Sequence, residues 1–172
     1  MERSWLSITS RVALSSALVG WAVCVVGVPE TAAADTKADV ALNGTFTAFS
    51  NGQYAKTNDR FHDEESVTST WTITTTCSTY TECSGHVTSD QGWTAPVTYI
   101  SPMWFVVRTI DGWEHCADGT TAPGTQTFKF FLDQQFNPTN LKGWDNTLNE
   151  SGSCGINKVL NIELPFTLTP VG

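Results

Sequence analysis

Apolar and hydroxyl-bearing side chains alternate position by position between residues 67 and 77. One face of this segment carries Val67, Trp71, Ile73 and Cys77, and threonines occupy all five positions of the other. In an extended chain successive side chains point to opposite faces, so a period of two is typical of an antiparallel strand with one buried and one solvated face. The pattern predicts a strand over 67–77.

Further segments combine Val, Ile, Phe, Trp and Thr in short runs, which favours strands. They are Gly44–Phe49, Gly85–Ser89, Trp93–Ile100, Met103–Ile110, Thr125–Leu132, Leu141–Thr147 and Val159–Leu168. Pairs such as Ser-Pro, Asp-Gly, Pro-Gly and Asn-Pro separate them and predict turns. The polar stretch 51–65 is interpreted as a loop or one short helical turn. No helical period extends beyond a single turn after residue 34.

This order of elements predicts an all-β fold. We expect about eight strands in a single antiparallel β-barrel, with a two-sheet sandwich as the alternative. Consecutive strands usually pair, and closing the sheet removes its exposed edges. Both arguments favour a meander that closes into a barrel.

The N-terminus has the features of a secretory signal peptide. Arginines precede an uncharged run over 12–28, and the small residues of 31–34 supply an A-x-A cleavage site. We therefore predict that residues 1–34 are a signal peptide and that residues 35–172 form a secreted β domain, with no stable membrane anchor after cleavage. An uncleaved anchor is the alternative, because the run is close in length to a membrane span.

Cysteine content agrees with export. Once Cys24 leaves with the signal, Cys77, Cys83, Cys116 and Cys154 remain. An even number of cysteines in an exported chain predicts two disulfides, for which three connectivities exist. We prefer Cys77–Cys83 with Cys116–Cys154, because the first pair flanks a short polar turn. No C-x-x-C motif occurs and the histidines are scattered, so we expect neither a metal site nor a cofactor.

Charge excludes one class of partner. The chain of 172 residues has 9 Lys and Arg against 17 Asp and Glu, a formal net charge of −8. Nucleic-acid binding requires clustered cations to contact phosphates, so nucleic acid is not an expected partner. Charged residues make up only 15% of the chain, which argues against intrinsic disorder.

Tryptophan is the candidate ligand-binding residue. The predicted mature domain contains Trp71, Trp93, Trp104, Trp113 and Trp144. Aromatic rings of this kind line pockets for apolar or carbohydrate ligands, although the same residues also fill cores. Core packing is the more ordinary interpretation of each one.

Catalytic motifs are weak. Asp111 and Glu114 lie three positions apart, but nothing in the sequence fixes the carboxylate separation that a glycosidase needs. The acidic segment 59–65 lacks the alternating oxygen ligands of a calcium loop. No G-x-S-x-G elbow is present. We therefore predict no catalytic residue, and a secreted hydrolase is the least favoured function.

A set of residues across the mature chain resembles a known group of proteins. It consists of Trp71–Cys77, Cys83-Ser84-Gly85, Trp104, Cys116–Thr120, Thr125–Phe128, Leu141–Gly143 and Cys154-Gly155. These residues resemble small mycobacterial secreted proteins of unassigned function, and they are similar to the extracellular domain of some mycobacterial receptor Ser/Thr kinases. The resemblance implies an extracytoplasmic β domain with two disulfides and no assigned active site. It implies no membrane signalling, because this sequence contains no kinase domain.

The function predicted from these features is a secreted, disulfide-bonded β-barrel binding module. Its expected partner is a small apolar molecule of the cell envelope or an extracellular protein. The alternative is a structural or interaction protein of the cell surface with a filled core. A hollow of a few hundred cubic ångströms would favour the binding module.

Overall fold

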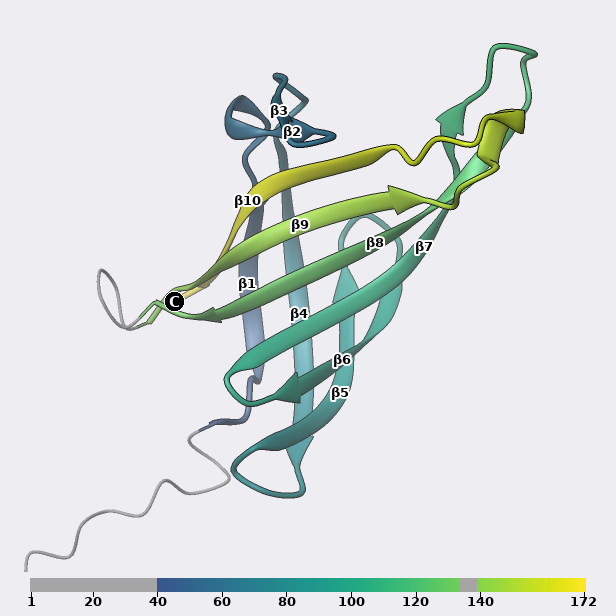
Figure 1. Ribbon diagram of the computed structural model, residues 1–172. Helices are drawn as coiled ribbons and strands as arrows, with labels where there is room; N and C mark the ends of the chain where they lie inside the picture. The colour runs from purple at the N-terminus through teal and green to yellow at the C-terminus, as the bar shows by residue number, and fades with distance from the viewer. Residues whose placement is uncertain (1–39, 134–138) are drawn as a thin grey trace, which may run out of the picture. The chain divides into compact units, whose positions relative to one another are not determined.

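A computed structural model describes residues 40–133 and 139–172. Within this part of the chain the long strands form a closed eight-stranded antiparallel barrel (Figure 1). The predicted signal peptide lies outside the described residues. The all-β prediction is confirmed, and the closed barrel decides against the sandwich.

The barrel is a meander in which each strand from β4 to β10 pairs with the next. β1 closes it by pairing with β4 on one side and with β10 on the other. The barrel strands are β1 (Gly44–Ser50), β4 (Val67–Cys77), β5 (Glu82–Ser89), β6 (Thr94–Ile100), β7 (Met103–His115), β8 (Thr121–Leu132), β9 (Leu141–Asn149) and β10 (Asn161–Pro170).

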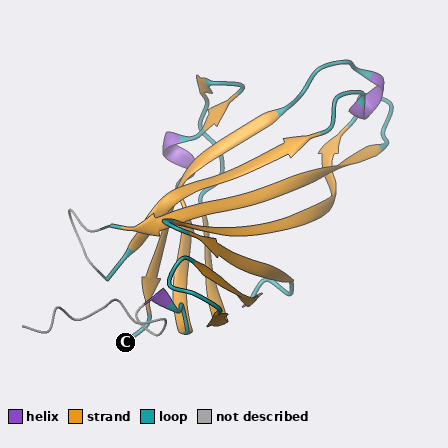
Figure 2. Cartoon of the chain, turned by 60° about the horizontal axis from the view of Figure 1, so that its bottom comes forward, coloured by secondary structure: helices purple, strands orange, loops and turns teal. Residues whose placement is uncertain are grey.

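Small elements decorate the connections (Figure 2). The single-turn 3-10 helices are η1 (Gly52–Tyr54) and η2 (Ser153–Gly155), and the short strands are β2 (Lys56–Thr57) and β3 (Arg60–Phe61). β2 extends the sheet from β10, and β3 pairs only with β2. Segment 51–65 therefore contains the expected helical turn, but its loop interpretation missed this hairpin.

Strand bounds agree closely with the sequence prediction. β4 has the predicted bounds, and its inward positions are buried while its threonine face is exposed. β7 and β8 are longer than predicted, because a bulge between Ile110 and Glu114 lets the two strands pair again nearer their turn. Val67 was assigned to the apolar face, yet it is exposed at the first position of β4.

The two ends of the barrel differ in what they carry. We call the end with residues 40–43, 78–81, 101–102 and 171–172 the terminal end. The opposite end, with residues 51–66, 90–93, 116–120 and 150–160, is the loop end. Every barrel strand runs from one of these ends to the other. Side chains from the ends of different strands therefore meet at each end.

The middle of the barrel is a packed apolar core. Trp71 contacts Phe128 with ring centroids 4.8 Å apart and Phe166 at 5.4 Å. The side chains of Val97, Val106 and Phe130 have no solvent exposure. The filled core expected for a scaffold is therefore present in this layer, and any hollow lies nearer the ends.

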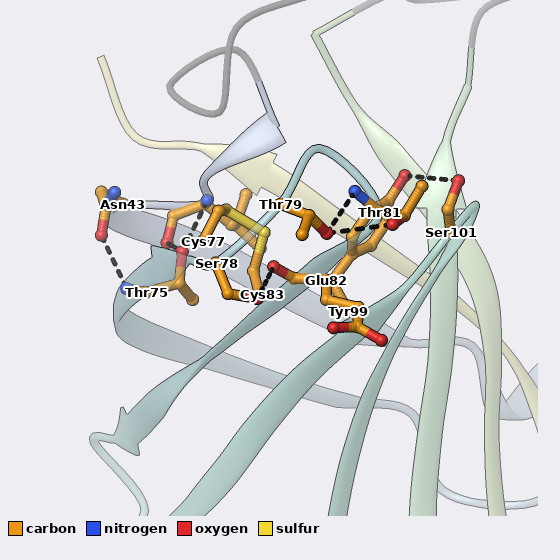
Figure 3. The surroundings of a disulfide bond; sticks show 11 residues. Asn43, Thr75, Cys77, Ser78, Thr79, Thr81, Glu82, Cys83, Tyr99 and Ser101 are labelled. Carbon is orange, nitrogen blue, oxygen red and sulfur yellow. Dashed lines mark hydrogen bonds between the residues drawn. A yellow bond between two sulfur atoms is a disulfide. The ribbon is translucent and has the colours of Figure 1, made fainter.

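Two disulfides have the preferred pairing. Cys77 and Cys83 face each other across β4 and β5 at the terminal end (Figure 3). Cys116 and Cys154 join the β7–β8 turn to η2 at the loop end. Among the residues described, no helix is long and apolar enough to cross a membrane.

Candidate functional site

The barrel brings together only some of the predicted tryptophans. Trp71 and Trp93 meet edge to face inside the barrel, with ring centroids 5.4 Å apart. Trp104 is buried nearer the terminal end, where its ring lies 4.8 Å from that of Tyr99. The interior tryptophans therefore belong to two regions.

The remaining two tryptophans line neither of the cavities described below. Trp144 is exposed on the outer face of β9, where its ring centroid lies 6.1 Å from that of Phe131. Trp113 follows the bulge of β7 and lies over Gly124, where an added Cβ would come within 2.7 Å of its ring. Close approach of the indole therefore requires glycine at position 124.

A hollow of about 590 Å³ opens at the terminal end. Buried Phe46, Trp104 and Leu141 form its apolar base, together with the half-buried ring of Tyr99. The exposed side chain of Leu132 lies at its rim. Asp133 and Lys142 add one ion pair to the lining, with a separation of 2.8 Å.

The wall of this hollow includes the chain that enters β1. Leu42 donates its backbone N–H to Thr75 Oγ1 at 2.9 Å, and Thr75 Oγ1 in turn donates to the Leu42 carbonyl at 3.0 Å. The Thr75 N–H donates to Asn43 Oδ1 at 2.7 Å, close to the Cys77–Cys83 disulfide (Figure 3). These bonds hold residues 42–43 against β4, and Val40 and Leu42 pack on the core from there.

A second, smaller recess of about 190 Å³ lies toward the loop end. Trp71, Phe128 and Phe166 line its apolar side, and Trp93 stands beside them. Its polar lining comes from Ser50, Ser69, Gln91, Arg108, Gln126 and Asp145. No lining residue is shared with the terminal-end hollow.

Hydrogen bonds link the polar residues of this recess into one network. Ser50 Oγ donates to Asp145 Oδ2 at 2.7 Å, and Gln126 Nε2 donates to Asp145 Oδ1 at 2.8 Å. Arg108 Nε donates to Gln126 Oε1 at 2.7 Å. The guanidinium of Arg108 also lies 4.4 Å from the ring centre of Trp93, within reach of a cation–π interaction.

Burial sets the electrostatics of the network. It raises the pKa of Asp145, although hydrogen bonds from Ser50 and Gln126 and the charge of Arg108 oppose the rise. Burial also lowers the pKa of Arg108, which the charge of Asp145 partly offsets. Desolvation disfavours both charged forms, so the two groups depend on each other and on their hydrogen bonds.

Sequence reasoning did not select these network residues. Gln126 and Asp145 occupy inward strand positions, on the same face of their strands as the apolar residues Phe128 and Leu141. One sequence signal would have found them. In a strand, residues two or four positions apart share a face, so a polar residue at that spacing from apolar inward residues also points into the barrel.

The carboxylates considered for catalysis do not form a comparable site. Asp111 is exposed, and Glu114 accepts a hydrogen bond from Asn149 Nδ2. Across residues 40–133 and 139–172, no group of three or more His, Cys, Asp or Glu side chains gathers as metal ligands would.

The barrel is similar to a solved structure, the monomer form of the sensor domain of PknI from M. tuberculosis. The two chains align with a TM-score of 0.55 and 15% identity, over 77% of this chain and 88% of that one. They share a fold. The resemblance to the extracellular domain of a mycobacterial receptor kinase is thereby confirmed as a similarity of structure.

Comparison of the sequence with known families and curated proteins finds no relative of this chain, since no family model and no curated protein matches it. At this identity the PknI sensor domain defines the fold alone, so an argument for function has to start from the two cavities.

Proposed function

We propose that this protein is an extracellular binding module that takes an apolar ligand into the terminal-end hollow. The observation that carries the proposal is the hollow itself, of about 590 Å³ and based on Phe46, Trp104 and Leu141. Its volume lies in the range of small-molecule sites, and such sites are mostly apolar with a few polar groups. The ion pair of Asp133 and Lys142 supplies the polar edge.

Three features support an extracellular setting. The signal-like N-terminus is the sequence argument, and the two disulfides fit an oxidising compartment. The similarity to the PknI sensor domain agrees with an outward-facing domain that meets ligands. We therefore place the ligand among the apolar molecules outside the cytoplasm.

Binding is tested with a neutral apolar dye, N-phenyl-1-naphthylamine, whose fluorescence rises in apolar surroundings. The disulfide-bonded protein is titrated with the dye, and a saturable signal with a micromolar dissociation constant is expected. In the Leu132→Glu variant a charge enters the rim of the hollow, and we expect the affinity to fall by about tenfold.

The matched control is Leu148→Glu. Leu148 is 41% exposed and Leu132 is 44% exposed, but Leu148 does not line the hollow. The same charge change there should leave the dye affinity unaltered. Absence of saturable binding, or equal loss in both variants, would overturn the proposal and leave the packed scaffold as the better interpretation.

A further inference from the structure

The loop-end recess has a floor made of aromatic rings. Trp71, Phe128 and Phe166 contact one another with centroids 4.8 to 5.4 Å apart. The indole N–H of Trp71 is already used, because it donates to Ser69 Oγ at 3.0 Å. These three rings are buried, so they close the base of the recess, and the half-buried ring of Trp93 is the aromatic face that a ligand can reach.

The opposite side of the recess offers both kinds of hydrogen-bonding group. Ionised Asp145 only accepts, Arg108 only donates, and Gln126 does both. In the described part of the chain one of the five guanidinium N–H groups of Arg108 is hydrogen-bonded to a protein atom, through Nε. Each oxygen of Asp145 accepts one hydrogen bond and retains a second lone pair. The network is held in place and still has capacity for a ligand.

Charge and size narrow the ligand class. Arg108 and Asp145 cancel each other, so the recess does not call for a charged ligand. Hydroxyl groups donate and accept, and a polyhydroxylated ring therefore matches the mixed lining better than an aliphatic chain or an anion. A closed cavity of about 150 Å³ holds benzene. This recess measures about 190 Å³ and opens to solvent, so it can receive one ring and not two.

The recess is accessible from outside. Two residues of its lining, Val67 at the start of β4 and Gln91 in the β5–β6 turn, are exposed. A ring at the end of a longer chain can therefore reach the recess from this end while the rest of the chain stays in solvent.

We propose that the loop-end recess binds a single neutral sugar ring, free or at the end of a glycan. The ring lies against Trp93, and its hydroxyl groups bond to Arg108, Gln126 and Asp145. This site is independent of the terminal-end hollow and differs from it in ligand chemistry.

The test is saturation-transfer NMR on the disulfide-bonded protein. The probes are D-glucose, D-galactose, D-mannose and D-arabinose, each with its methyl glycoside, and benzoate serves as an anionic comparison. We expect at least one sugar to bind with a millimolar dissociation constant. Binding of the methyl glycoside as well as the free sugar indicates a glycan end, and binding of the free sugar alone indicates a monosaccharide.

Arg108→Met removes the guanidinium and keeps most of the side-chain length, so we expect at least a fivefold loss of sugar affinity. Arg60→Met is the control, because Arg60 is exposed on β3 and lines no part of the recess. Val67→Phe narrows the rim without entering the core, and it should also weaken binding. Val107→Phe is its control, with Val107 44% exposed and Val67 41% exposed.

The dispersion of methyl NMR signals shows whether each variant is folded. If Arg108→Met does not fold, Val67→Phe still tests the site. Three results would overturn the proposal: no sugar binds at 20 mM, benzoate binds in preference to every sugar, or both recess variants bind like their controls. Dye binding at the terminal end should be unchanged in all four variants, so failure of one site is distinguishable from failure of the other.

Discussion

Ser50 and Asp145 meet inside the barrel although 95 positions separate them in sequence, with Ser50 Oγ 2.7 Å from Asp145 Oδ2. Both side chains are buried. Ser50 ends β1 and Asp145 lies in β9, and β10 runs between these two strands. The hydrogen bond therefore spans the strand through which the barrel closes.

The burial of Asp145 makes folding sensitive to pH. Because its pKa is raised in the folded state, the native protein binds a proton more readily there than the unfolded chain. This contribution to stability is present at low pH and is lost as the pH rises above the ordinary aspartate pKa of 3.8 and through the raised value. Asp145→Asn removes the titration, and its amide can still bond to Ser50 and Gln126. We expect denaturant unfolding between pH 4 and pH 7 to show a smaller loss of stability in the variant than in the wild type.

Asp118→Asn is the control for this measurement. Hydrogen bonds from Thr120 lower the pKa of Asp118, so its linkage to stability has the opposite sign. Stability profiles of wild type and Asp145→Asn that run parallel across this pH range would contradict the assignment.

Barrel curvature makes glycine necessary at position 143. A Cβ added there would lie 1.9 Å from the Lys129 carbonyl oxygen and 2.7 Å from Phe130 Cα, both backbone atoms of β8. Since backbone cannot move aside as a side chain can, we expect Gly143→Ala to cost more than about 3 kcal/mol of unfolding free energy.

Gly92→Ala separates crowding from backbone conformation. Gly92 has φ of +81°, and a Cβ added there would meet no atom within 4 Å. We therefore expect Gly92→Ala to lower the free energy of unfolding by only about 1 kcal/mol. Thermal or denaturant unfolding of the two variants measures the difference. Equal destabilisation would mean that the strands can separate at Gly143.

The barrel strands were predictable because their inward positions are apolar at a period of two. β4 is the clearest case, with Trp71 and Ile73 buried and the threonines between them exposed. β2 and β3 were not predictable. Each is two residues long, and their side chains are exposed or half-buried, so no alternation exists to detect.

The candidate sites were less predictable than the strands, because the residue types in a strand do not show which of them point into the barrel. In β9 the apolar residues Leu141, Trp144 and Leu148 fall on both faces, and the inward set includes Asp145 instead of Trp144. Selecting the tryptophans by residue type therefore included Trp144, whose side chain is exposed on the outer face. The polar network becomes visible only when closure brings β1, β7, β8 and β9 around one space.

Removal of residues 1–34 remains a proposal, and it has a direct test. The protein expressed with its own N-terminus in a bacterial host should appear outside the cytoplasm with Asp35 as its first residue, because the small residues before it suit signal peptidase. Mass spectrometry of the exported protein measures this terminus. Recovery of the full-length chain in the membrane fraction would support the uncleaved anchor instead.

The two disulfides should differ in their effect on stability. Cys77 and Cys83 are separated by 6 positions and already face each other in the β4–β5 ladder, so their bond restricts a short loop. Cys116 and Cys154 are separated by 38 positions and tie the β7–β8 turn to η2. A longer closed loop removes more entropy from the unfolded chain, and the difference amounts to about 1.5 kcal/mol. We expect Cys116→Ser with Cys154→Ser to lower the denaturant midpoint more than Cys77→Ser with Cys83→Ser, at an unchanged m-value. The reverse order would show that the β4–β5 hairpin depends on its disulfide for native geometry, and that the loop end is stabilised by its other contacts.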